Sequence, residues 1–143
     1  MISFLCKWKP RSVRAKLTDK YKQAILDGYR KYYPEPLGLL DGELYGIAYY
    51  FYKGVTQLDA DNLSKPIWDA LESAIYRNDK AVKIRFSGIY QIGRPGSVEF
   101  LDMTTMPVNV QGDFLELIDE ADHLIYIEIG HWSPGLYRMG VEL

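Results

Sequence analysis

The chain has 143 residues, of which 48% are hydrophobic, and its formal net charge is −2. This length is enough for one domain with a buried core and too short for two ordinary domains, so we expect a single domain spanning residues 1–143. The only cysteine, Cys6, excludes an intramolecular disulfide and a cysteine-ligated metal site, and it suits the reducing cytoplasm. No apolar run approaches the roughly 20 residues that cross a bilayer, so we expect a soluble, cytoplasmic protein with no membrane partner.

The charge is distributed unevenly along the chain. Residues 1–31 contain nine lysines and arginines against two aspartates, so this segment carries +7 and the remainder carries −9. A positive segment beside an acidic body is what a polyanion-binding enzyme with a metal site needs. A solvated basic helix face explains the same charges equally well, and both interpretations stay open.

The first half of the chain predicts a strand, a helix and a second strand. Residues 2–8 alternate apolar and polar side chains, which favours a strand that Pro10 stops. Residues 18–33 place apolar side chains at helical spacing before Pro34, which predicts a helix. The tyrosine-rich residues 44–53 predict a long strand that leads toward a group of carboxylates.

The clearest helix lies in the middle of the sequence and is expected to begin near Lys65. From Leu63 to Ile75, apolar residues recur at i, i+4, i+7, i+8, i+11 and i+12 and form one stripe. Pro66 is compatible with this helix if it lies in the first turn, where amide hydrogens have no intrahelical partner.

The second half predicts two further strands and a short acidic helix. Residues 81–90 alternate Val82, Ile84 and Phe86 against polar neighbours, as a half-exposed strand does. We also expect a short strand at 98–101, a helix at 114–122 and a last strand at 124–129. These elements together predict an α+β domain in which a mixed sheet packs against two main helices.

The last third of the chain is strongly acidic. Residues 99–143 contain only one basic residue, Arg138, against nine carboxylates. These are Glu99, Asp102, Asp113, Glu116, Asp119, Glu120, Asp122, Glu128 and Glu142. Residues 101–122 look like an insertion, which suits a polyanion-binding protein only if the segment faces away from the polyanion or covers a subunit edge.

Three aspartates bracket the central helix. If Asp59 and Asp61 lie on extended backbone, their side chains point to the same face, because strand side chains alternate with period two. Asp79 follows the helix, and the return of the chain can place it beside this pair. Three such carboxylates can hold Mg²⁺ or Mn²⁺, and these ions take phosphate oxygens as further ligands.

A lysine on the same helix completes the pattern. Lys65 and Asp69 are four residues apart and share one helix face, so Lys65 can reach toward the aspartates while Asp69 orients it. Asn62 stands just before the expected helix and is a candidate cap. Taken singly, each of these features is more often a solvated pair or a turn; their combined spacing favours a functional site.

This pattern resembles the RusA family of Holliday junction resolvases, which are common in phages and prophages. The motif is Asp59-x-Asp61-Asn62-x-x-Lys65-x-x-x-Asp69-x-Leu71, followed by Asp79. The resemblance is centred on residues 57–90. It implies that Asp59, Asp61 and Asp79 are metal-binding catalytic carboxylates, that Lys65 is the catalytic lysine, and that Asn62 and Asp69 support them. It also implies a RusA-like fold and a Mg²⁺-dependent homodimer that cuts two opposed strands symmetrically.

The sequence therefore predicts a metal-dependent endodeoxyribonuclease that acts on branched DNA, such as a four-way junction, in recombination and repair. Mg²⁺ is the expected cofactor, with Mn²⁺ as a substitute. Arg11, Arg14 and Lys16 are the expected DNA contacts, because basic side chains bind phosphates without reading sequence. The acidic last third keeps an alternative open: a non-catalytic nucleic-acid-binding or regulatory protein with the resolvase fold. A purely structural module is a third possibility.

Overall fold

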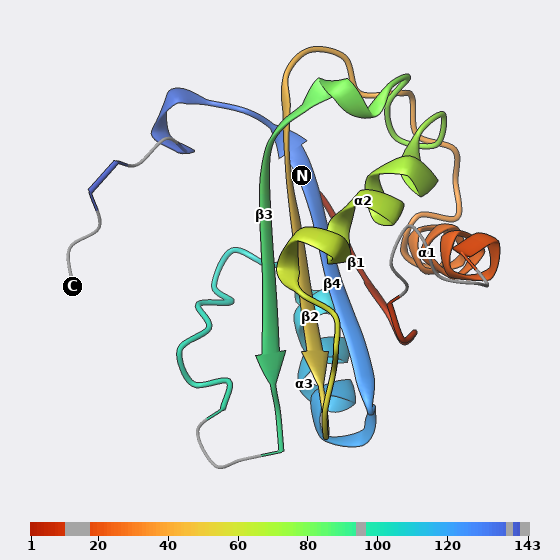
Figure 1. Cartoon of the computed structure of the whole chain (residues 1–143). Coiled ribbons are helices and arrows are strands. Elements are labelled where there is room, and N and C mark those ends of the chain that lie inside the picture. Colours follow the sequence, from red (N-terminus) through yellow and green to blue (C-terminus); the bar gives the residue numbers. More distant parts are fainter. Residues whose placement is uncertain (11–17, 94–96, 137–138, 141–143) are drawn as a thin grey trace.

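The computed structural model describes the whole chain except residues 11–17, 94–96, 137–138 and 141–143. Its strands form one mixed sheet in the order β1-β4-β2-β3 (Figure 1). The strands are β1 (Ile2–Cys6), β2 (Leu44–Tyr52), β3 (Val82–Gln91) and β4 (His123–His131). β4 is antiparallel to both of its neighbours, β1 and β2, whereas β2 and β3 are parallel. The predicted α+β class with a mixed sheet is confirmed.

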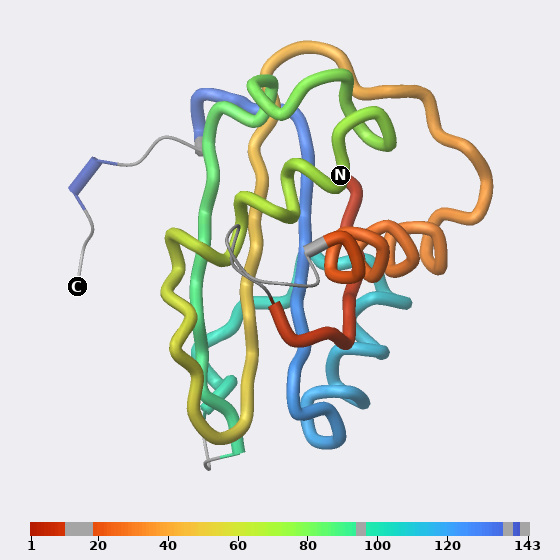
Figure 2. Tube along the Cα trace, turned by 45° about the vertical axis from the view of Figure 1, so that its right-hand side comes forward, coloured from red at the N-terminus to blue at the C-terminus, as the bar shows by residue number. Residues whose placement is uncertain are grey.

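Helices cover both faces of this sheet. They are α1 (Thr18–Tyr32), α2 (Ala60–Leu71) and α3 (Val108–Glu120). α1 and α2 lie on one face of the sheet and α3 lies on the opposite face, as both Figure 1 and Figure 2 show. The prediction of two main helices was therefore incomplete. Among the described residues, no helix is both long and apolar enough to cross a membrane.

The central strands separate two apolar cores. In β2, Ala48 and Tyr50 pack on the α1 and α2 side, whereas Phe51 packs with α3. The side chains of β4 alternate in the same way: Ile125 and Ile127 belong to the first core, and Leu124 and Tyr126 belong to the second. Alternation with period two explains this division. The sheet therefore lies between the two cores, and α2 packs against one of its faces.

α2 begins and ends earlier than its apolar stripe predicts. It starts five residues before Lys65, because Asp59 on extended backbone caps it. Pro66 consequently lies in the second turn and not in the first, where it removes an intrahelical donor, yet the helix continues around it. The helix stops before Ser73, whose positive φ of 68° departs from helical backbone. Ile75 is nevertheless buried, so the apolar stripe predicted burial beyond the helix itself.

β3 does not keep a strict alternation, contrary to the sequence prediction. Val82 and Ile89 are seven residues apart, yet both pack in the core on the α2 side. The register with β2 explains this, because Leu44 pairs with Val82 and the next residue, Tyr45, pairs with Ile84. One extra residue in β3 is a β-bulge, which reverses the faces of all later side chains.

Part of the acidic last third belongs to the second apolar core. α3 is longer than the helix predicted at 114–122, and its Val110, Phe114 and Ile118 are buried against the sheet. Glu116 and Glu120 are exposed residues of α3, and α3 covers the face of the sheet opposite α2. Residues 97–100 form a turn, so the short strand expected at 98–101 is absent from the described structure. These two acidic charges thus lie on the face of the sheet opposite the predicted site.

Candidate active site

The first turn of α2 carries two of the predicted site residues. Asp59 is the N-cap, with φ −100° and ψ 168°, and its Oδ1 accepts a hydrogen bond of 2.9 Å from the backbone N–H of Asn62. Asn62 is therefore the capped residue and not the cap. Asp61 lies inside the helix and is exposed, so the two aspartates do not share a face of a strand as predicted. Both carboxylates instead lie at the positive end of the helix dipole.

Lys65 and Asp69 continue the same exposed face of α2. The Nζ atom of Lys65 lies 3.5 Å from Oδ1 of Asp69, as expected from their spacing of four residues. The Lys65 side chain is 56% exposed, and an exposed pair of this kind contributes about 0.2–1 kcal/mol at most. Asp61, Lys65 and Asp69 follow one another at intervals of four, so the amine lies between two carboxylates along the helix.

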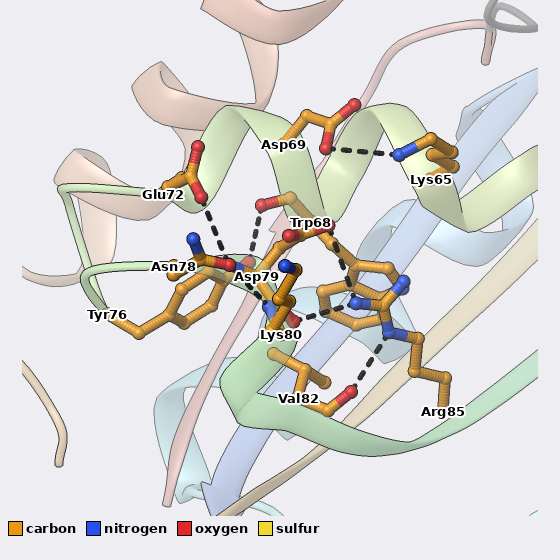
Figure 3. A network of polar contacts seen from close by, with 10 residues as sticks. All are labelled: Lys65, Trp68, Asp69, Glu72, Tyr76, Asn78, Asp79, Lys80, Val82 and Arg85. Atoms are coloured by element: carbon orange, nitrogen blue, oxygen red, sulfur yellow. Dashed lines mark hydrogen bonds and ion pairs between the residues drawn. The ribbon is translucent and has the colours of Figure 1, made fainter.

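Asp79 stands on a separate segment after α2, at the start of the short 3-10 helix η1 (Asp79–Ala81). Asn78 caps this turn by accepting a hydrogen bond from the N–H of Lys80. The Asp79 N–H donates to Oε1 of Glu72 over 3.1 Å, and Arg85 contacts Asp79 from β3 (Figure 3). Nη2 of Arg85 lies 2.7 Å from the backbone oxygen of Asp79 and 3.5 Å from its Oδ2. These contacts hold Asp79 next to Arg85.

The three predicted metal ligands are not gathered in this structure. Among the described residues, no three His, Cys, Asp or Glu side chains lie close enough together to hold a metal ion. The oxygen donors of Asp59, Asp61 and Asp79 suit a hard divalent cation chemically, but the arrangement does not fit one. The candidate DNA contacts Arg11, Arg14 and Lys16 lie outside the described residues.

A buried aromatic pair supports α2 at the level of Asp69. Trp68 is fully buried over Gly46 of β2, where an added Cβ would lie only 2.5 Å from the indole ring. The hydroxyl of buried Tyr76 donates a 2.5 Å hydrogen bond to the backbone oxygen of Trp68. Burial is the main reason why the pKa of Tyr76 is well above its usual value, so the residue remains a neutral donor. The buried side of α2, opposite its charged face, is therefore held by the packing of Trp68 and by the hydrogen bond from Tyr76.

Sequence reasoning missed the residues that surround Asp79. Glu72 and Arg85 each contact Asp79, and neither belongs to the motif. Glu72 is three residues after Asp69, a helical spacing that was a usable signal. Arg85 had no such signal, because only the bulge in β3 turns it toward α2.

Comparison with known proteins identifies the class. A family model described as endodeoxyribonuclease RusA matches residues 10–96, which include the whole motif, Asp79 and Arg85. This class consists of enzymes that cut DNA within a strand. The match covers more than half of the chain, and the protein belongs to the RusA endodeoxyribonuclease family. No match to a curated protein was found.

Proposed function

We propose that the protein is a Mg²⁺-dependent, structure-selective endodeoxyribonuclease that resolves Holliday junctions in recombination and repair, in the setting of a phage or prophage. The observation that carries this proposal is the ordered motif from Asp59 to Asp69 on the exposed face of one helix, inside the segment that matches the RusA family. Branched DNA is the substrate that this family membership implies. Metal dependence, the junction itself and the dimer are the parts to be tested.

The proposed roles follow from the chemistry of each side chain. Asp59, Asp61 and Asp79 are the proposed holders of Mg²⁺, or of Mn²⁺ in its place. In this structure Asp79 contacts Arg85 at 3.5 Å. Lys65 presents an exposed ammonium group one turn after Asp61, where it can neutralise charge that develops on a phosphate oxygen. Asp69, at 3.5 Å, restrains this amine as a positioning residue.

Two further elements complete the proposal. Arg11, Arg14 and Lys16 are the proposed contacts to the DNA backbone, which supply affinity without sequence information. Cutting two opposed strands of a four-way junction symmetrically requires two sites related by a twofold axis, so we propose a C2 homodimer.

One observation favours a second candidate function. Among the described residues no group of three metal-binding side chains is present, and Asp79 is already partnered by Arg85. A non-catalytic nucleic-acid-binding or regulatory protein with the resolvase fold has no need of such a group. This alternative predicts binding to branched DNA without metal-dependent cutting.

The first experiment compares cleavage of a labelled synthetic four-way junction with cleavage of the matched linear duplex, with Mg²⁺ and with EDTA. We expect paired symmetric nicks that require Mg²⁺ and that fall at least about 100-fold in Asp61→Asn, the range seen when a single transition-state contact is lost. Asp19→Asn is the matched control, because Asp19 is also an exposed aspartate in the first turn of a helix.

The outcomes separate the two candidates. Junction binding with no cutting in either Mg²⁺ or Mn²⁺ by the intact protein supports the non-catalytic alternative. Equal cutting by the intact protein and by Asp61→Asn contradicts the assignment of Asp61 to the site. If Asp19→Asn loses cutting as well, the loss in Asp61→Asn comes from removing a carboxylate at a helix N-terminus and not from the proposed site.

A further inference from the structure

The bulge in β3 directs Arg85 toward the proposed site. After the register shift, Arg85 pairs with Gly46 of β2, which lies directly beneath Trp68 of α2. Paired residues of parallel strands point to the same face of a sheet, so Arg85 lies on the α2 side. Figure 3 shows Arg85 reaching from β3 toward Asp79, with its guanidinium hydrogen-bonded there. β-Bulges commonly re-aim a side chain next to a functional site.

Backbone oxygens hold the guanidinium in place. Nε of Arg85 donates to the Val82 oxygen over 3.1 Å, and Nη2 donates to the Asp79 oxygen over 2.7 Å. The contact to the Asp79 carboxylate is longer, at 3.5 Å, and both side chains are partly exposed. Within the described part of the chain, Nη1 has no hydrogen-bond partner. The group is thus fixed in position by neutral acceptors while part of its charge and two of its donors remain available.

The neighbouring side chains add to this positive charge. Arg77, Lys80 and Lys83 are exposed, and with Arg85 they give residues 77–85 four cations against the single carboxylate of Asp79. This net charge of +3 is carried by the end of the turn before η1, by η1 itself and by the first residues of β3. A partner that matches it is a polyanion that can place a phosphate beside Arg85.

We propose that Arg85 binds a backbone phosphate of the DNA strand that enters the site, through Nη1 and the open edge of its guanidinium. The role rests on the proposed function, because it assumes a DNA substrate on the α2 face. The planar fork of arginine matches two phosphate oxygens, whereas lysine offers only a point charge. The anchoring carbonyls of Val82 and Asp79 reduce the entropy lost on binding, since the side chain is ordered beforehand.

The test is equilibrium binding of a labelled four-way junction, measured by fluorescence anisotropy in EDTA at several salt concentrations, so that no cutting is required. For Arg85→Gln we expect weaker binding to junction and duplex alike, and a salt slope smaller by about one unit, as for one lost phosphate contact. Arg85→Lys keeps the charge and is expected to retain most of the slope while binding more weakly, because the fork is lost. Circular dichroism verifies that each variant is folded.

Lys53→Gln is the control for loss of a positive charge elsewhere. Its Nζ contacts the Asp119 oxygen at the end of α3, away from the α2 face. We expect its slope to equal that of the intact protein. An Arg85→Gln slope equal to that of the intact protein overturns the phosphate contact and leaves the proposed function standing. An intact protein that binds neither branched nor linear DNA overturns the proposed function itself.

Discussion

The two faces of the sheet hold their carboxylates in different ways. On the α2 face, Asp69 and Asp79 each lie 3.5 Å from a cation, and these pairs are open to solvent. On the α3 face, both oxygens of Glu128 accept hydrogen bonds from tyrosine hydroxyls, at 2.6 Å from Tyr45 and 2.5 Å from Tyr126. Loose ionic pairs can exchange partners with a ligand, whereas short hydrogen bonds from a buried and a half-buried phenol, Tyr126 and Tyr45, are structural.

This difference also separates the charges of the molecule. Within the described residues, the only two salt bridges are those of Asp69 and Asp79, so the carboxylates on the α3 face are not paired with a cation. A cavity of about 220 Å³ on that face is lined by both Asp102 and Glu128. A phosphate backbone is repelled there, and the α2 face is the one that DNA can approach.

The largest change in stability is expected from Tyr126→Phe on the α3 face. Removing this hydroxyl leaves one oxygen of Glu128 without its donor, and a hydrogen bond to a charged group contributes about 1.5–3 kcal/mol. The free energy of unfolding in urea measures the loss. Tyr52→Phe is the matched control, because no hydrogen bond of its hydroxyl is found in the described structure, and we expect it to cost less than about 0.5 kcal/mol. Equal losses in the two variants contradict the structural role of the tyrosine.

A medium effect is expected from pH at Cys6, in the core on the α1 side. Burial, with a smaller contribution from Asp27, raises the pKa of this thiol from 9.0 to about 12. The unfolded thiol ionises first, so stability that is fully present below pH 9 is lost as the pH rises toward 12.

Cys6→Ala removes this one titration. Between pH 8 and pH 10, the free energy of unfolding of the intact protein should fall by roughly 1.4 kcal/mol more than that of Cys6→Ala. Urea unfolding at both pH values measures the difference, and the offset that the lost sulfur causes at pH 8 cancels. Parallel pH dependence of the two proteins contradicts burial of the thiol.

The smallest effect is expected from Lys65→Gln on the α2 face. The variant loses an exposed i,i+4 pair, which contributes about 0.2–0.5 kcal/mol. Urea unfolding measures this change, and Asp69→Asn serves as the reciprocal control with the same expected loss. A loss above about 1 kcal/mol in either variant would show that the pair is structural. If the loss is small, any decrease in junction cutting by Lys65→Gln reports on chemistry and not on folding.

The sequence predicted most of the elements because their apolar periods are local. The strand at 44–53 and the helix at 18–33 agree with the structure within one residue, and the shared face of Lys65 and Asp69 is confirmed. The start of α2 was missed because Asp59 caps the helix before any residue needs to be buried. A helix cap depends on one polar side chain, so it does not appear in the spacing of apolar residues along the sequence.

The arrangement around Asp79 was not accessible in this way. It depends on a one-residue shift between β2 and β3, and a pairing register is a property of two segments that are distant in sequence. Arg85 therefore looked like an ordinary polar position of an exposed strand. The structure shows that a single extra residue decides which side chain faces the helix.

The same bulge affects how β3 behaves as a free edge. β3 is ten residues long and, among the strands that the structure describes, pairs on one side only, so its outer amides and carbonyls can serve as a template for a foreign strand. The bulge interrupts that template near its beginning, and Lys83 and Arg85 are exposed charged residues at or near it. Such features deter edge-to-edge pairing and aggregation. Solubility during expression is thus a second property that depends on these basic residues, and neutral variants of Arg85 should be handled at low concentration.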